Sequence, residues 1–369
     1  MFFRPRCPKR SRAAVRVATL GVLFLIGVRL IYLRHLFALE PLFSSRNRAV
    51  TLLVWTHPFG RARKLPDCFA LYRIGGCTIT DDWSAYSQAD AVIIHHREVG
   101  TGAADLPTEP RPRAQKWIWL NYESPAHTPG LWRMEGVFNL TMTYRTDSDI
   151  FLPYGYLVPL ARTREALQNS LARPLRVPPR ARLLRPRLLA WVISNWSESH
   201  ARVSFYYQLR QHVQVDVFGR AGRPVPRDGD GGGGSGSGSV VRLLGRYQFY
   251  LALENSQHTD YVTEKLWNAV LAGAVPVVLG PSRRNYERFL PPEAFIHADD
   301  FPTARGLARY LLLLWRDPAR LSRHLEWRRG YGAHQPAFWA EHYCASCRAV
   351  RRTRTRSDVV TDLSRWFNS

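Results

Sequence analysis

Lysine is scarce in this basic chain. Of its 52 lysines and arginines only four are lysines, at Lys9, Lys64, Lys116 and Lys265. The formal net charge of +23 would suit a nucleic acid or an anionic membrane as a partner. However, the arginine-dense runs 162–187 and 347–356 lack the interleaved aromatic residues of a single-strand binder, and no nucleic-acid motif accompanies them. We therefore expect no nucleic-acid partner, and attribute the arginine excess to genomic base composition or to a solvated basic surface.

The N-terminal apolar run, residues 13–33, has no small-residue cleavage site after it. It follows a cluster of basic residues and is interrupted only by Arg16 and Arg29 near its two ends. This pattern favours an uncleaved membrane anchor over a removed signal peptide, although a cleaved signal of a secreted protein is the alternative. The positive-inside rule then predicts a type II topology with a lumenal remainder: a cytosolic tail at 1–12, a transmembrane signal anchor at 13–36 and a stem at 37–48.

Cysteine is also rare, with five residues in the whole chain. Cys7 falls in the predicted cytosolic tail and should stay reduced. The other four, Cys68, Cys77, Cys344 and Cys347, form an even set that suits two disulfides in an oxidising lumen. A zinc site is the rival interpretation, but the spacing of Cys68 and Cys77 is wrong for a zinc knuckle. Three disulfide connectivities are open, and the sequence alone does not choose among them.

Apolar residues make up 46% of the chain, which is enough for packed cores and excludes wholesale disorder. Buried-strand patterns in the first half occur at 50–55, 91–95 and 117–120, spaced for helical crossovers, and in the second half at 188–194 and 213–218. After Leu311 the pattern is helical. We predict an acceptor-side α/β domain at 49–160, a linker at 161–187, a ligand-binding α/β domain at 188–335 and a returning C-terminal segment at 336–369. The glycine-rich stretch 228–239 is expected to be a disordered surface insertion.

Residues 247–280 are the most informative stretch. An apolar run ends at Glu254, a polar loop follows, an amphipathic helix is predicted over 263–272, and a β-branched strand is predicted over 274–279. Such a unit binds anions beyond the strand's carboxyl end, where helix N–H groups point outward. Lys265 and Glu264 stand in the first helical turn. A cation for a diphosphate beside an acid for sugar hydroxyls predicts a nucleotide-sugar site.

The sequence ENSQHTDYVTEKLWNAVLAGAVPVVLG, residues 254–280, resembles the signature of animal α-1,3-fucosyltransferases. That family transfers fucose from GDP-fucose to N-acetyllactosamine-type glycans. The resemblance covers roughly 50–160 and 188–369. It implies a GT-B-like α/β fold in which two Rossmann-like domains face a cleft, preceded by one transmembrane helix in the Golgi membrane. GDP-fucose and the lactosamine-type glycans of glycoproteins and glycolipids are the implied partners.

The resemblance also implies the donor-binding residues. Arginine suits a diphosphate because its planar fork makes paired, charge-assisted hydrogen bonds. With Lys265, Arg202 would neutralise the charge that develops on departing GDP. The residues implied to contact GDP-fucose are Tyr154, Val192, Ser194, Asn195, Arg202, Tyr250, Asn255, Tyr261, Glu264 and Lys265.

Glu123 lies in the segment WIWLNYESPAHTPG, where an apolar strand runs into a turn-rich loop. A glutamate at the carboxyl end of a strand belongs to ligand binding in an α/β sheet, although a solvated loop glutamate is the plain alternative. An inverting transfer needs a carboxylate to take the proton from the attacking hydroxyl. The matching glutamate in the family's ESP motif is the general base, and the resemblance carries that role to Glu123. We expect Glu123→Ala or Lys265→Ala to abolish transfer without unfolding the protein. The roles of His95 and His96 stay open.

Asp147 and Asp149 form a DxD sequence, which binds Mn²⁺ in other glycosyltransferases. A site with Arg202 and Lys265 needs no metal, so we expect no metal and no cofactor beyond the donor substrate.

Three further expectations follow. The resemblance implies the disulfides Cys68–Cys344 and Cys77–Cys347, and it places Arg61 near the acceptor, where close relatives have a glutamine. Two glycosylation sequons begin at Asn139 and Asn195. Because a glycan on Asn195 would block the donor, we expect Asn139 to be the modified residue.

The sequence therefore predicts an inverting, metal-independent α-1,3-fucosyltransferase that makes Lewis x or sialyl Lewis x-type products. The rivals are an inactive glycan-binding membrane protein, a basic nucleic-acid binder, and transfer to another position such as the 1,4-linkage or the core N-glycan.

Overall fold

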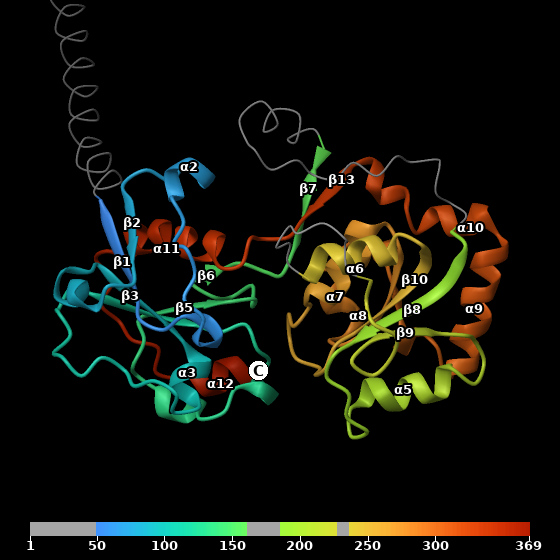
Figure 1. Ribbon diagram of the computed structural model, residues 1–369, viewed down its shortest axis with the longest axis horizontal. Coiled ribbons are helices and arrows are strands. Elements are labelled where there is room, and N and C mark those ends of the chain that lie inside the picture. The colour runs from blue at the N-terminus through green and yellow to red at the C-terminus, as the bar shows by residue number, and fades with distance from the viewer. Residues whose placement is uncertain (1–48, 161–184, 227–235) are drawn as a thin grey trace, which may run out of the picture. The chain divides into compact units, whose positions relative to one another are not determined.

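The computed structural model describes residues 49–160, 185–226 and 236–369 (Figure 1). The predicted anchor and stem lie outside these residues, as does the predicted linker up to residue 184. No helix in the described ranges is long and apolar enough to cross a membrane. Val50–Ser369 belong to one unit, which contains every feature discussed below.

Six parallel strands form the first sheet, in the order β2-β1-β3-β4-β5-β6. The strand predictions at 50–55, 91–95 and 117–120 are confirmed as β1, β3 and β4, whose side chains are almost all buried. A run of apolar residues without alternation is expected for parallel strands covered on both faces. The bounds are β1 Val50–Val54, β2 Cys77–Thr80, β3 Ala91–His95, β4 Lys116–Leu120, β5 Leu140–Thr143 and β6 Ile150–Phe151.

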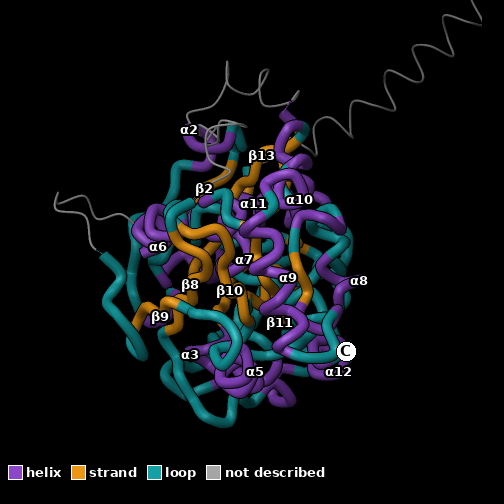
Figure 2. Tube along the Cα trace, turned by 90° about the vertical axis from the view of Figure 1, so that its right-hand side faces the viewer, coloured by secondary structure: helices purple, strands orange, loops and turns teal. Residues whose placement is uncertain are grey.

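Five parallel strands form the second sheet, in the order β12-β11-β10-β8-β9. Its two faces carry different helices, as Figures 1 and 2 show. Trp191 and Leu251 face helices α5 and α9, whereas Tyr250 and Ala252 face α6, α7 and α8. The strands are β8 Arg187–Ile193, β9 Asp216–Gly219, β10 Tyr247–Leu253, β11 Val275–Leu279 and β12 Ile296–His297. The helices are α5 Ala201–Leu209, α6 Gly236–Leu244, α7 Glu264–Ala272, α8 Arg283–Tyr286 and α9 Ala304–Arg316.

The two sheets share one topology. In each, the second strand along the chain lies at one edge beside the first, and the later strands follow on the other side. The chain therefore changes direction across the sheet between β1 and β3, and again between β8 and β10. Ligands of doubly wound sheets bind beyond the carboxyl ends of the strands at such a point. The prediction of two Rossmann-like α/β sheets is confirmed.

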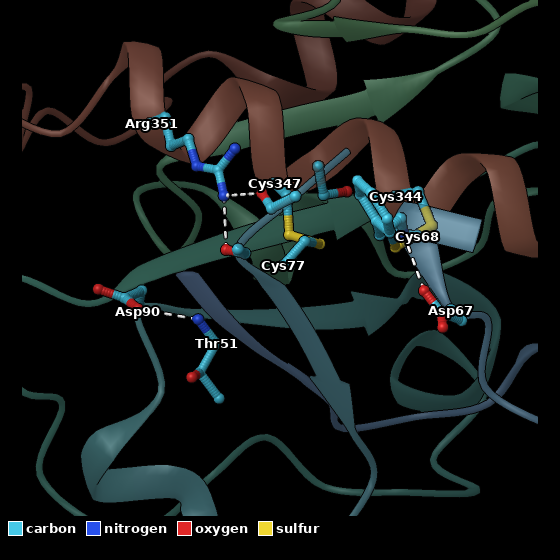
Figure 3. Close-up of a disulfide and its surroundings, with 12 residues drawn as sticks. Thr51, Asp67, Cys68, Cys77, Asp90, Cys344, Cys347 and Arg351 are labelled. Atoms are coloured by element: carbon cyan, nitrogen blue, oxygen red, sulfur yellow. Dashed lines mark hydrogen bonds between the residues drawn. A yellow bond between two sulfur atoms is a disulfide. The ribbon is translucent and has the colours of Figure 1, made fainter. Parts of the chain in front are cut away.

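Two disulfides fasten the C-terminal segment to the first sheet. Cys68 is joined to Cys344 and Cys77 to Cys347, which is the pairing that the family resemblance implies. Both cysteines of the C-terminal segment lie on α11 (Ala340–Arg352), which packs against β1 and α2 (Cys68–Tyr72). Beside the disulfides, Arg351 donates to the carbonyls of Gly75 and Gly76 at 2.6 and 2.5 Å (Figure 3). The bridges close loops of 276 and 270 residues, so they remove much conformational freedom from the unfolded chain.

A two-stranded antiparallel sheet joins β7 (Tyr156–Pro159) to β13 (Tyr331–His334). The prediction of helical structure after Leu311 missed β13, because a four-residue strand that contains one glycine and follows another carries too little β-pattern to be read alone. The remaining helices are α3 His96–Gly100, α10 Pro318–Arg323 and α12 Leu363–Asn368. The short 3₁₀ helices are Pro58–Gly60, Trp83–Gln88, Pro125–His127, Leu131–Met134, Pro292–Ala294, Ala298–Asp300 and Glu326–Arg329.

Three boundaries differ from the sequence predictions. Residues 236–239 of the glycine-rich stretch form the first turn of α6, so the expectation of disorder was wrong there. Strand β9 begins at Asp216 and not at Val213, whose N–H donates to Leu209 O at 3.2 Å and closes α5. The end of the predicted linker belongs to the second sheet: Arg185 is buried and donates to Leu244 O and Tyr247 O at 3.0 and 2.9 Å.

Candidate active site

The predicted donor residues gather at the carboxyl ends of two adjacent strands. Ser194 and Asn195 follow β8, and Asn255 follows β10 after Glu254. These strands flank the point where the second sheet changes direction. The location is the one at which a doubly wound sheet binds its ligand.

Lys265 is held by three oxygen atoms at the start of α7. Its Nζ lies 2.8 Å from Thr263 Oγ1, 3.2 Å from Glu254 Oε2 and 3.2 Å from Glu264 Oε1. The contacts with Thr263 and Glu264 are hydrogen bonds, and the contact with Glu254 is an ion pair. The two carboxylates differ in exposure, because the side chain of Glu254 is 0% exposed and that of Glu264 is 48% exposed.

Lys265 and its carboxylate partners shift each other's pKa values toward the charged forms. Burial alone would lower the pKa of Lys265, but the carboxylates of Glu254 and Glu264 outweigh it and raise that pKa above its usual value. Burial raises the pKa of Glu254, although Lys265 limits the rise. For Glu264, the attraction of Lys265 outweighs burial and lowers the pKa. Lys265 therefore stays charged at neutral pH.

Arg202 comes from α5 and is 4% exposed. One terminal nitrogen donates to Asn195 O at 2.5 Å, while Nε has no hydrogen-bond partner among the described residues. Asn255 Oδ1 is likewise buried and without a partner in the described ranges. Buried polar atoms are nearly always satisfied, so a donor and an acceptor left free here suit a polar ligand.

Buried tyrosines line the same region. Tyr250 on β10 is 2% exposed, and Tyr261 is 3% exposed. The ring of Tyr261 lies 5.1 Å from that of Tyr144 and 6.5 Å from that of Tyr154. The sequence segments 144–154 and 250–261 therefore meet at these rings.

Glu123 follows β4 by three residues and is half-buried. Its N–H donates to Asn121 Oδ1 at 3.2 Å, which fixes the turn. Burial is the main reason that the pKa values of Tyr154 and Tyr261 are raised, and the negative charge of Glu123 adds to both. The same Tyr261 also experiences the charges of Lys265, Glu254 and Glu264. Glu123 thus shares a neighbour with the donor cluster.

A direct contact joins the two loops. Ser256 Oγ donates to Ser124 Oγ at 2.6 Å, and Ser124 is fully buried beside His127. The residue next to Glu123 therefore touches the loop that carries Asn255. Arg61 is exposed, and none of the hydrogen bonds or ion pairs of the described residues connects it to Glu123 or to the donor cluster.

Sequence reasoning missed Glu254 as a site residue. Its carboxylate accepts from Thr263 N at 2.9 Å and from Thr263 Oγ1 at 2.8 and 3.0 Å, besides pairing with Lys265. The available signal was a lone carboxylate directly after a strand of seven buried residues. Such a charge is retained only where it is paired.

His95 and His96 are structural in this geometry. His95 Nδ1 lies 2.5 Å from Glu98 Oε2, and both side chains are buried. His96 Nδ1 accepts from Trp119 Nε1 at 3.1 Å, which leaves Nε2–H to donate to Pro129 O at 2.8 Å. Burial lowers the pKa of His96, in agreement with a neutral ring.

The DxD carboxylates have protein partners. Asp147 accepts from Arg145 at 2.9 Å and from Trp366 Nε1 at 2.9 Å. Asp149 accepts from Thr141 N at 2.9 Å and contacts Arg356 at 3.2 Å. Within the part of the chain that the structure describes, no three His, Cys, Asp or Glu side chains form a group suited to a metal ion.

Asn139 is 6% exposed, and its amide is fully engaged. Nδ2 donates to Ser357 O and Asp358 O at 3.3 and 3.0 Å, and Oδ1 accepts from Trp117 N at 2.9 Å. A glycan on Nδ2 would displace one of these contacts, so the folded structure opposes the predicted modification at Asn139. Asn195, which we expected to be bare, is exposed.

These features define an α/β protein with a strand-end site for an anionic ligand and a carboxylate nearby. A solved structure of an alpha1,3-fucosyltransferase with GDP-fucose has the same fold, with a TM-score of 0.51 and 18% identity over 85% of this chain and 92% of that one. Two family models match as well: "Fucosyltransferase, N-terminal" over residues 47–155 and "Glycosyltransferase family 10 (fucosyltransferase) C-term" over residues 183–366.

Individual relatives agree. The human 4-galactosyl-N-acetylglucosaminide 3-alpha-L-fucosyltransferase FUT6 is 45% identical over 86% of this chain and 82% of its own length. Human alpha-(1,3)-fucosyltransferase 4 is 44% identical over 87% of this chain, which spans 65% of that relative's length. The chain belongs to glycosyltransferase family 10, the fucosyltransferases.

Proposed function

We propose that this chain transfers L-fucose from GDP-fucose to the 3-OH of N-acetylglucosamine in lactosamine-type glycans, sialylated or not, giving Lewis x or sialyl Lewis x-type products. The names of its relatives support the reaction and the acceptor class, and the solved structure with GDP-fucose supports the donor. The observation that carries the proposal is geometric. Ser124, the residue next to Glu123 in the first sheet, accepts from Ser256 Oγ at 2.6 Å, so the loop of Glu123 touches the loop of the second sheet that carries Asn255.

The donor half of the site, which contains Arg202, Glu254, Glu264 and Lys265, suits a nucleoside diphosphate. Arg202 and Lys265 supply two positive charges, and charges fixed in advance stabilise a leaving diphosphate without reorganisation. Lys265 is already paired with Glu254 and Glu264, so donor binding requires a change of partners. Glu264 is the exposed partner and is the one to leave, which frees its carboxylate for sugar or ribose hydroxyls. Glu254 is buried and continues to hold Lys265.

The acceptor half of the site is the part that carries Glu123, and this carboxylate suits the role of general base. Glu123 has no side-chain hydrogen bond or ion pair with the described residues, so its carboxylate is free to accept a proton from the attacking hydroxyl. Attack on the face opposite GDP inverts the anomeric centre. The proposal also includes a cleft between the two sheets, with Arg61 on its acceptor side.

Metal independence and membrane attachment are also parts of the proposal. Arg202 and Lys265 do the neutralising work that a cation performs elsewhere, and Asp147 and Asp149 are engaged by other side chains. Residues 13–36 would anchor the chain in the Golgi membrane as a single-pass type II protein with its catalytic part in the lumen.

The test is a transfer assay on the full chain in detergent. The protein is incubated with GDP-fucose and neutral or sialylated lactosamine, and the product linkage is determined by NMR. An α-1,3 linkage to N-acetylglucosamine is expected. Transfer only to an added Galβ1-3GlcNAc or N-glycan-core acceptor, with an α-1,4 or core linkage, would overturn the acceptor assignment, and GDP-fucose binding without any product would indicate a glycan-binding protein in place of an enzyme.

A further inference from the structure

The carboxylate of Asp260 joins segments that belong to both sheets. Its side chain is 2% exposed and accepts four hydrogen bonds. Oδ2 accepts from Thr146 N at 2.9 Å and from Thr146 Oγ1 at 2.7 Å. Oδ1 accepts from Asn285 Nδ2 at 2.7 Å and from Arg288 at 2.9 Å. Thr146 follows β5 of the first sheet, whereas Asn285 and Arg288 belong to α8 and the residues after it in the second.

The backbone of Asp260 is in an unusual conformation. Its φ is +61°, in the left-handed region that is unfavourable for most residues other than glycine. Its N–H donates to Asn285 Oδ1 at 2.9 Å, and its carbonyl accepts from Val262 N at 2.8 Å. Strain of this kind persists where surrounding contacts over-determine it, and it concentrates at functional sites.

The tight turn at Asp260 directly precedes the donor residues in the sequence. Tyr261 follows directly, Thr263 caps α7, and Glu264 and Lys265 form its first turn. On the other sheet, Tyr144 precedes Thr146 by two residues and contacts the ring of Tyr261 at 5.1 Å. The same two segments are therefore connected twice, once by the Asp260 hydrogen bonds and once by aromatic rings.

We propose that Asp260 is a positioning residue that sets the distance between the donor cluster and Glu123. This inference rests on the proposed function. Arg202, Glu254 and Lys265 all belong to the second sheet or its loops, and the Glu254–Lys265 pair does not involve Asp260, so that pair persists when the connection to Thr146 is lost. What changes is the placement of Tyr261 and α7 relative to the segment that follows β5. Loss of Asp260 should therefore impair transfer more than donor binding.

The first test compares Asp260→Asn with the wild-type chain. Asparagine tolerates the left-handed region and has nearly the same volume, but its Nδ2 only donates, so it cannot accept from the two donors that one of the Asp260 oxygens now serves. Because a displacement of about 1 Å can cost about 100-fold in rate, we expect kcat to fall by about that factor. The KM for GDP-fucose and the Kd for GDP should change by less than about threefold, since the binding contacts remain. Asp299→Asn is the control, because that carboxylate is 73% exposed.

A second pair of variants acts from the other sheet without touching the donor loop. Thr146→Val removes the hydroxyl but keeps the N–H contact, so kcat should fall by about 10-fold, in line with loss of part of the alignment. Thr146→Ser keeps the hydroxyl and should restore wild-type kcat. In the double variant with Asp260→Asn, the two effects should be clearly less than additive.

The outcomes separate the two proposals. A folded Asp260→Asn protein with wild-type kcat and only a lower melting temperature would show a purely structural residue and overturn the inference. Equal losses in GDP affinity and kcat would also overturn it. A wild-type chain that neither binds GDP-fucose nor transfers fucose would refute the proposed function itself.

Discussion

The two halves of the site hold their functional groups in different ways. In the donor half, Lys265 is fixed by Glu254, Glu264 and Thr263, and the buried charges depend on one another. In the acceptor half, Glu123 has no charged partner among the described residues and is placed by a turn that Asn121 fixes. Two disulfides join the acceptor half to the C-terminal segment. The donor half has no disulfide, because the sequence between Cys77 and Cys344 contains no cysteine.

This contrast predicts that substitutions in the two halves affect folding stability and catalytic turnover differently. A side chain inside a buried charge network contributes to both, because removing it leaves its partners unpaired. A carboxylate without partners contributes to the reaction alone. Substitutions in the donor half should therefore damage folding and binding together, and substitution of Glu123 should damage turnover only.

Glu123→Gln should have the largest effect on activity. Loss of a general base costs about 10²–10⁴-fold in kcat, while a substitution away from structural contacts changes stability by less than about 0.5 kcal/mol. Transfer rates, GDP affinity and urea unfolding of the same preparation check this. Glu109→Gln, on an exposed side chain of the same sheet's loops, is the control. A marked loss of stability in Glu123→Gln would contradict the contrast between the halves.

Lys265→Met should lose donor affinity and stability together. The variant leaves the buried carboxylate of Glu254 without its cation, and breaking a buried pair costs about 3–5 kcal/mol. The sequence alone predicted that replacing Lys265 would leave the fold intact, and the structure changes that expectation. GDP binding by calorimetry and urea unfolding measure the two losses.

The double variant Lys265→Met with Glu254→Gln sharpens the comparison. Neutralising the orphaned carboxylate should recover most of the stability while GDP affinity stays low. Recovery of both would mean that Lys265 matters only as a structural partner. Recovery of neither would mean that the Glu254 carboxylate is needed for more than pairing with Lys265.

His342 makes the acceptor half sensitive to pH. It is fully buried on α11 against Tyr122, Phe338 and Trp339, and neither ring nitrogen has a hydrogen-bond partner among the described residues. Burial lowers its pKa to about 3, against about 6.5 in an unfolded chain. Between those values the unfolded state binds the extra proton, so stability is lost as the pH falls below about 6.5. The loss is at most about 1.4 kcal/mol per pH unit.

His342→Phe tests whether His342 causes the predicted loss of stability at low pH. The aromatic replacement cannot be protonated, so the free energy of unfolding should depend less on pH between about 6.5 and 4. Urea unfolding at several pH values, with the disulfides intact, gives the slope. His212→Gln, at an exposed position, should keep the wild-type slope. An unchanged slope in His342→Phe would show that other groups cause the acid sensitivity.

Much of the second sheet and its site could be predicted because the signals are contiguous. The strand-loop-helix-strand unit at 247–280 places its own residues by local pattern, and α7 begins one residue from its predicted start. The cross-sheet contacts could not be predicted in this way. Nothing local reveals that Asp260 reaches Thr146, 114 positions away, or that Ser256 reaches Ser124, 132 positions away.

The same limit applies to Asn139, to Glu254 and to the disulfides. Asn139 matches a sequon in the sequence, but only the packing of the C-terminal segment shows that its amide is engaged by Ser357 and Asp358. Glu254 looked like the polar end of a strand, and its pairing with Lys265 depends on how the loop returns. Disulfide connectivity was likewise open from spacing, and the family resemblance supplied it.

The smallest expected effect concerns metal ions. Transfer should be the same in excess chelator and in added Mn²⁺, because Arg202 and Lys265 already place two positive charges at the donor half. Asp149→Asn should lower stability by about 1 kcal/mol through its contacts with Thr141 and Arg356 and leave kcat unchanged. Activity that is lost in chelator and restored by Mn²⁺ would contradict the prediction of metal-independent transfer. It would also mean that Arg202 and Lys265 do not suffice to neutralise the charge on departing GDP, and that the donor half needs a metal ion in addition.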